Sequence, residues 1–156
     1  MMLRTFEVSD LAAVRELIHR TIVECYPSAY PPHAVAYFKR FHSDDAVLAR
    51  ARDGSVVVIE DAGAILATGA VVGSDVSAVF VAPERQREGL GGTMMDELEG
   101  HAVRSGHSSV SLSVSLPSRS FYEQRGYRVI EACSIDVGEE QRLEYWQAVK
   151  DLAGGS

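Results

Sequence analysis

The sequence has little cysteine, no long apolar run and fewer basic than acidic residues. Cys25 and Cys133 lie far apart without metal-ligand spacing, so we interpret them as free, buried thiols in a reducing compartment. No apolar run approaches membrane-spanning length and no secretory h-region opens the chain, so we expect a cytoplasmic protein that does not enter a membrane. A net charge of -7 argues against nucleic-acid binding, which requires clustered lysine and arginine.

The composition is that of an ordinary globular protein. Hydrophobic residues make up 46% of the 156-residue chain and charged residues 24%. A chain of this length buries about 70% of its unfolded surface. We therefore predict a single domain over residues 1–156.

Hydrophobic periodicity predicts a helical first third followed by alternating strands and helices. The first helix is expected to be capped by Ser9-Asp10 and to end before Pro27, and an ordered proline-rich loop follows over 26–33. The remaining expected helices cover 34–41 and about 43–51, begin at Gly89 and run to Gly106, and begin at Pro117 and run to Arg125. The expected strands cover 2–7, 55–60, 64–72, 75–81, 109–114 and 127–135. Three consecutive strands form an antiparallel meander, and the second half of the chain alternates strands with helices. We therefore predict an α+β fold with a mixed sheet covered by helices on both faces.

A glycine cluster follows the strand that ends at Val81. Gly89, Gly91 and Gly92 open a helix, where free N–H groups and the helix dipole favour an anion, most often a phosphate. The spacing fits neither the dinucleotide fingerprint nor a P-loop. A plain helix start, with small residues for packing, is the alternative interpretation.

Two separate motifs resemble those of the GNAT superfamily of acetyl-CoA-dependent N-acetyltransferases. The segment from Gln86 to Gly91, Gln-Arg-Glu-Gly-Leu-Gly, is similar to the family's acyl-CoA signature Arg/Gln-x-x-Gly-x-Gly/Ala. About thirty residues later, the segment from Ser115 to Tyr127 is similar to Asn-x-x-Ala-x-x-Phe-Tyr-x-x-x-Gly-Phe. Serines at 115 and 118 replace the family's asparagine and alanine, so a specific contact from residue 115 stays open.

The resemblance implies a layered α/β/α fold with a mostly antiparallel sheet of about six to seven strands. It also implies a final strand over 142–150, where local propensity alone leaves helix and strand open. Acetyl-CoA is the implied co-substrate, with no metal. Backbone N–H groups of 87–93 are expected to hold its diphosphate, and the strand at Phe80 and Val81 to pair with its pantetheine arm. The implied cofactor-binding residues are Phe80, Val81, Gln86, Arg87, Glu88, Gly89, Leu90, Gly91, Gly92, Thr93, Ser115, Ser118 and Tyr122.

Two residues match catalytic positions of the family. Tyr122 matches a tyrosine that protonates the departing thiolate, although its place on a short amphipathic helix also fits a core aromatic. Asp75 stands where relatives that acetylate histones have a glutamate base, although it also fits a hairpin turn. Glu60, His33 and His42 are weaker alternatives for the base.

The resemblance places the acceptor site near residues 26–41, where Tyr26, Tyr30, Tyr37 and Phe38 form either a pocket wall or ordinary helix packing. We predict direct transfer of acetyl to a primary amine of a small molecule or peptide, by a monomer or homodimer. Neither cysteine lies within the motifs, which disfavours an acyl-cysteine route. The alternatives are a non-catalytic acyl-CoA binding or sensing module and, with less support, a nucleotide-binding protein without CoA chemistry.

Overall fold

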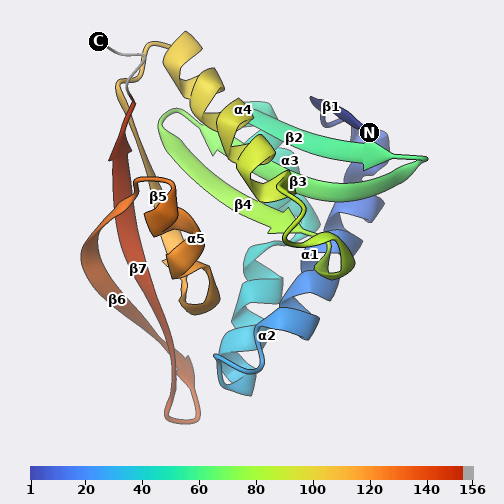
Figure 1. Ribbon diagram of the computed structural model, residues 1–156. Helices are drawn as coiled ribbons and strands as arrows, with labels where there is room; N and C mark the ends of the chain where they lie inside the picture. Colours follow the sequence, from blue (N-terminus) through green and yellow to red (C-terminus); the bar gives the residue numbers. More distant parts are fainter. Residues whose placement is uncertain (153–156) are drawn as a thin grey trace.

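The computed structural model describes residues 1–152, so the last four residues of the predicted 1–156 domain lie outside it. Within this range the strands form one seven-stranded sheet in the order β1-β2-β3-β4-β5-β7-β6 (Figure 1). The strands are β1 (Met2–Thr5), β2 (Ser55–Asp61), β3 (Ala64–Val72), β4 (Asp75–Val81), β5 (Ser109–Ser115), β6 (Arg128–Gly138) and β7 (Gln141–Asp151). The α-helices are α1 (Leu11–Cys25), α2 (Pro32–Phe41), α3 (Asp44–Asp53), α4 (Leu90–Arg104) and α5 (Arg119–Gln124), and the short 3-10 turns are η1 (Val8–Asp10), η2 (Pro83–Arg85) and η3 (Leu116–Ser118). None of these helices is long and apolar enough to cross a membrane.

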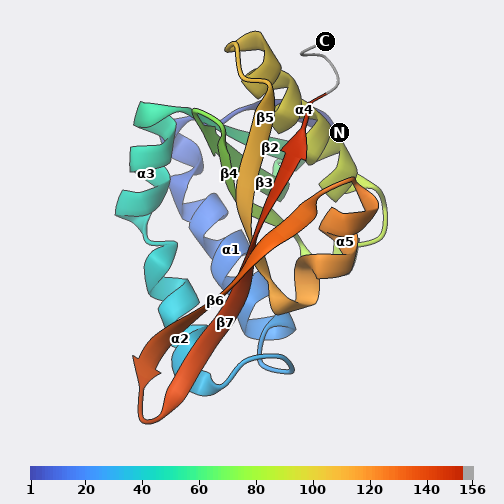
Figure 2. The same ribbon diagram turned by 90° about the vertical axis from the view of Figure 1, so that its left-hand side faces the viewer.

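The helices cover both faces of the sheet, as predicted. Figure 2 shows α1, α2 and α3 on one side of the strands and α4 and α5 on the other. The alternation of β2 divides its side chains between two cores: Val57 and Ile59 join the core under α4, and Val56 and Val58 join the core under α1–α3. All pairings in the sheet are antiparallel except that of β4 with β5. The α+β class, the layering and the mostly antiparallel sheet are confirmed.

The centre of the sheet is open on one side. Strands β4 and β5 pair only at Asp75 with Ser111 and at Val76 with Leu112. Beyond this point β5 pairs with β7 alone, and β4 pairs with β3 alone. A β-bulge interrupts β4 here, since Ala78 has a φ of 55° and the register with β3 shifts by one residue. The facing edges of β4 and β5 therefore diverge and leave main-chain groups without strand partners.

The sequence predicted β3 and β4 with their observed ends, and the strand at the C-terminus is confirmed as β7. The predicted N-cap of α1 is confirmed in position, because Asp10 is the N-cap residue, although its side chain makes no capping hydrogen bond. The Asp10 carboxylate accepts a hydrogen bond from the Glu7 N–H at 2.8 Å and pairs with Arg4 at 2.8 Å. One local prediction was wrong. Both cysteines are half-buried rather than buried.

Helix α4 lies close to the sheet because β3 has a glycine beneath it. A Cβ atom on Gly69 would lie 2.8 Å from Leu98 Cδ1 and 2.9 Å from Met94 Cγ, and both of those side chains are fully buried. This close approach sets the depth at which α4 sits on the sheet, and so the position of its first turn.

We predict that Gly69→Ala lowers the free energy of unfolding by about 1–3 kcal/mol, because the added methyl overfills a packed core. Gly100→Ala is the matched control, since its added Cβ meets only the mobile end of the exposed Arg104 side chain. That change is expected to stabilise the protein by about 0.5–1 kcal/mol, because alanine is the better helix former. Urea unfolding measures both variants. Equal stability of Gly69→Ala and the wild type would contradict the close packing of α4.

Candidate active site

Two cavities lie on either side of the point where β4 and β5 diverge. The inner cavity, about 210 Å³ in volume, lies between α2, nearly the whole of β4, β5 and β7. The glycine cleft, about 700 Å³, lies between the end of β4, the turn before α4, and α5. The residues that line both cavities are Tyr26, Val79, Phe80, Ser118 and Tyr122. The two spaces therefore meet at this group of side chains.

The first turn of α4 presents free N–H groups to the glycine cleft. Gly89 is left-handed with a φ of 85°, and its carbonyl accepts the first helical hydrogen bond, from Thr93 N–H at 3.0 Å. The N–H groups of Leu90, Gly91 and Gly92 precede that bond, and they donate to no backbone carbonyl within residues 1–152. These three residues line the cleft, so their N–H groups lie at the place where the glycine cluster predicts an anion.

Some groups of the predicted cofactor-binding residues make contacts within the protein. The N–H of Thr93 belongs to the helix, as does its hydroxyl, which donates to the Gly89 carbonyl at 3.1 Å. The carboxylate of Glu88 pairs with Arg85 at 2.9 Å. Neither Thr93 nor Glu88 lines the glycine cleft. Gln86 lines it, but its side-chain amide donates to the Val81 carbonyl at 3.1 Å and so holds the turn against β4.

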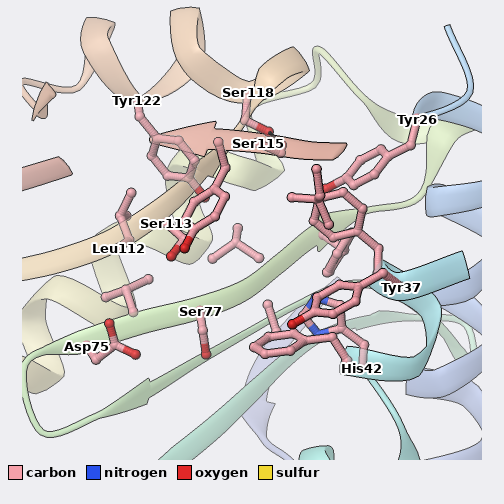
Figure 3. Close-up of a pocket in the computed structure, with 18 of the residues that line it drawn as sticks. Tyr26, Tyr37, His42, Asp75, Ser77, Leu112, Ser113, Ser115, Ser118 and Tyr122 are labelled. Carbon is pink, nitrogen blue, oxygen red and sulfur yellow. Dashed lines mark hydrogen bonds between the residues drawn. The ribbon is translucent and has the colours of Figure 1, made fainter. Parts of the chain in front are cut away.

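Tyr122 extends from α5 into the junction of the two cavities (Figure 3). The residue is 8% exposed, and its ring packs edge-on against Phe121 and Tyr127. Burial raises the pKa of the phenol, and the neighbouring Tyr26 raises it further. The phenol therefore keeps its proton at neutral pH and is available as a donor. Tyr122 is both a core aromatic and a cavity residue, so its two interpretations are compatible.

A second tyrosine, Tyr30, fixes the turn that leads into α5. Its hydroxyl donates to the Glu144 carbonyl at 2.7 Å and accepts from the Leu116 N–H at 2.9 Å. The phenol thus joins the α1–α2 loop to β7 and η3. Beside η3, the hydroxyls of Ser115 and Ser118 lie 2.7 Å apart. Ser118 lines both cavities, whereas Ser115 lines only the inner cavity. The sequence left Tyr30 either in a pocket wall or in ordinary helix packing; it packs against Tyr26 and Phe38, and its hydrogen-bonded bridge was not predicted.

Asp75 lies at the start of β4, on the rim of the inner cavity, across from Tyr122 (Figure 3). The residue keeps contact with solvent. Partial burial of its carboxyl group raises its pKa, and the positive charge of Arg50 lowers it by less. Asp75 follows the β3–β4 hairpin turn and also lines the cavity. Its two interpretations, as a turn residue and as a base, therefore do not exclude each other.

The other candidate bases are not suited to that role. The carboxylate of Glu60 pairs with Arg4 at 2.8 Å, and the His33 ring contacts the Val137 carbonyl at 3.2 Å; neither residue lines the inner cavity. His42 lines it, but its Nδ1 lies 3.1 Å from Arg50 Nη2. Because arginine only donates, Nδ1 must be the acceptor and Nε2 must carry the proton. His42 therefore faces the cavity as a neutral donor rather than a base.

The predicted acceptor residues divide between the cavity and the core. Tyr26, Tyr37 and Phe38 line the inner cavity, together with Phe41, and Tyr30 does not.

Within residues 1–152, no group of three or more His, Cys, Asp or Glu side chains is arranged to hold a metal ion.

Comparison with known proteins identifies the class to which this fold and site belong. A family model described as an acetyltransferase (GNAT) domain matches residues 26–138, which is more than half of the chain. The chain belongs to the GNAT acetyltransferase family. No curated protein sequence matches it.

Solved structures share its fold across nearly the whole chain. A GCN5-related N-acetyltransferase from Rhodopseudomonas palustris has a TM-score of 0.88 at 18% identity, covering 97% of this chain and 95% of that one. The PaiA N-acetyltransferase from Thermoplasma acidophilum, solved in complex with coenzyme A, has a TM-score of 0.75 at 16% identity, covering 96% and 98%. The ribosomal-protein-S18-alanine N-acetyltransferase from Escherichia coli has a TM-score of 0.72 at 17% identity, covering 97% and 93%. At these identities the likeness shows a common fold.

The buried His42 makes stability depend on pH. Burial, with Arg50 beside the ring, lowers the pKa of His42 from 6.5 to about 3. The unfolded chain therefore binds this proton below pH 6.5, whereas the folded chain binds it only near pH 3. The contribution of His42 to stability is complete above pH 6.5 and is lost, by about 1.4 kcal/mol per pH unit, as the pH falls from there toward 3.

We predict that His42→Asn, whose side-chain oxygen keeps an acceptor for Arg50, shrinks the loss of unfolding free energy between pH 7 and pH 5 by about 2 kcal/mol. Urea unfolding at the two pH values measures the difference. His107→Asn is the control, because His107 follows α4 and lines neither cavity, and it is expected to leave the pH dependence unchanged. A wild-type slope in His42→Asn would show that the His42 ring is accessible to protons in the folded protein.

Proposed function

We propose that this protein transfers the acetyl group of acetyl-CoA to a primary amine by direct attack, without a covalent enzyme intermediate. The observation that supports it is the meeting of the two cavities at Tyr122. One cavity is lined by the first turn of α4, where free N–H groups can bind an anion, and the other has a carboxylate, Asp75, at its rim. This arrangement suits direct transfer between two bound substrates, because both reactants can reach one donor from different sides.

Acetyl-CoA is proposed to occupy the glycine cleft, with its diphosphate on the N–H groups of Leu90, Gly91 and Gly92. A helix terminus contributes only about 0.3–2 kcal/mol to anion binding, whereas micromolar affinity needs about 8 kcal/mol. The pantetheine arm must supply much of the rest. Its amide groups are proposed to pair with the open edge of β4 beyond Val76, as an added strand would. The PaiA N-acetyltransferase from Thermoplasma acidophilum, which shares the fold, was solved in complex with coenzyme A, and this supports coenzyme A as the ligand.

The proposed chemistry places the thioester at the junction of the cavities. The amine nitrogen attacks the thioester carbonyl carbon, a C–N bond forms, and the C–S bond breaks with its electron pair going to sulfur. The Tyr122 phenol donates its proton to the sulfur as the negative charge develops there. The nitrogen carries a positive charge after the attack and loses a further proton, and this proton restores the Tyr122 phenol. The products are the acetylated amine and the free thiol of coenzyme A.

The amine must lose a proton before or during its attack. An aliphatic amine has a pKa near 10.4, so at neutral pH it enters the cavity almost wholly protonated. Asp75 is proposed to take this proton, directly or through a water molecule. Partial burial raises the pKa of its carboxyl group above the ordinary value, which makes the carboxylate a better base than an exposed aspartate.

We predict that Tyr122→Phe lowers kcat by about 100-fold or more and changes the affinity for CoA little, because it removes one proton donor and no packing surface. A thiol-release assay gives kcat, and calorimetric titration gives the affinity for CoA. Tyr127→Phe is the matched control: it removes a neighbouring buried phenol that donates to Glu99 at 2.8 Å and lines neither cavity. Its kcat is expected to stay close to that of the wild type.

An equal loss of CoA affinity and rate in Tyr122→Phe would contradict the donor role. Tight CoA binding by the wild type, without turnover of any amine, would instead favour a non-catalytic acyl-CoA sensing module.

A further inference from the structure

The wall of the inner cavity next to α2 is aromatic. Tyr37 and Phe41 stack with their ring centres 6.3 Å apart and their planes at 15°. Phe38 meets the ring of Tyr26 edge-on at 4.9 Å. These four side chains line the cavity, and Tyr145 of β7 joins them. Rings held by one another in this way present a flat, apolar surface with little freedom to rearrange, which suits a flat, apolar partner.

The cavity carries a single formal charge at neutral pH, and that charge is negative. Among its lining residues within the described chain, Asp75 is the only acid, and no lysine or arginine is present. His42 is neutral, for the reason given above. Arg50 lies behind the lining: its guanidinium is 5.7 Å from the centre of the Phe41 ring and donates to His42. A protonated amine is therefore attracted to the cavity, and a carboxylate placed beside Asp75 is repelled.

The β6–β7 hairpin forms one wall of the cavity, with Ile135 of β6 and Leu143 and Tyr145 of β7, and its tip is held against the start of α2. The His33 N–H donates to the Gln141 side chain at 2.7 Å, and the His33 ring contacts the Val137 carbonyl at 3.2 Å. Figure 2 shows the hairpin lying alongside α2. The cavity has a volume of about 210 Å³, less than the roughly 300–1,000 Å³ of sites for drug-sized ligands. The space suits a small molecule better than an extended peptide.

We infer that the acceptor is a small primary monoamine with an aromatic body and no carboxylate next to the amine. The inference rests on the proposed function and gives it a substrate class. The amine reaches toward Tyr122 and Asp75 while its ring lies against Tyr37 and Phe41. A diamine fits less well, because its second ammonium group would lie among apolar rings without a second carboxylate.

The test is the kcat/KM of the purified protein, at saturating acetyl-CoA, for four matched acceptors. These are 2-phenylethylamine, phenylalanine, 1,4-diaminobutane and a short peptide that begins with alanine. The first two differ only in the carboxylate. We expect 2-phenylethylamine to exceed each of the others by about tenfold or more.

Asp75→Asn tests the role of Asp75 in selecting the acceptor through a ratio, that of kcat/KM for 2-phenylethylamine to kcat/KM for phenylalanine. It lowers turnover of both phenyl compounds but brings their ratio closer to one, because the repulsion of the carboxylate of phenylalanine disappears. Asp45→Asn is the control, since Asp45 is exposed on α3 and lines neither cavity. Its ratio is expected to equal that of the wild type.

Faster turnover of phenylalanine, the diamine or the peptide overturns the inferred substrate class and leaves the proposed transferase reaction intact. An unchanged ratio in Asp75→Asn likewise overturns the role of Asp75 in selecting the acceptor. Absence of turnover with every amine, in a protein that binds CoA, overturns the proposed reaction and the substrate class together.

Discussion

The separation of β4 from β5 after Val76 is the constraint on which the site depends. Two strands that part in the middle of a sheet leave main-chain donors and acceptors without partners, which a compact fold avoids unless something else pairs with them. The bulge at Ala78 bends β4 away, and pairing with β7 holds β5 in place. Both cavities, the open edge proposed for pantetheine, and the position of Tyr122 follow from that divergence.

The surrounding contacts keep the divergence in one geometry. Tyr30 joins β7 to the turn before α5 through two hydrogen bonds, so the helix that carries Tyr122 cannot shift independently of the sheet. On the other side, Gln86 holds the glycine turn to the last carbonyl of β4, and Gly69 lets α4 sit deep on β3. The first turn of α4 is thus tied to β3 and β4, and the helix that carries Tyr122 is tied to β7. The proposed transfer reaction needs such preorganisation of its two binding regions.

Local patterns were enough to predict much of the fold and the cleft. The β-branched run of β2, the turn glycines around β3 and the glycine cluster before α4 each act within a few residues, so the sequence displays them directly. Three contacts were not predicted: the Tyr30 hydrogen bonds that bridge β7 and η3, the hydrogen bond from Arg50 to His42, and the ion pair between Arg85 and Glu88. The first two depend on the tertiary arrangement of segments, and the third depends on which way a loop side chain turns. The family resemblance supplied the last strand, where propensity left two choices open.

The central claim is that the gap between β4 and β5 receives the pantetheine arm and brings its sulfur to Tyr122. A crystal structure of the protein with CoA tests it most directly. The account predicts pantetheine amides hydrogen-bonded to β4 beyond Val76, the diphosphate on the N–H groups of residues 90–92, and the sulfur within about 3.5 Å of the Tyr122 hydroxyl. A CoA molecule bound elsewhere, or one whose arm leaves the edge of β4 unpaired, would contradict it.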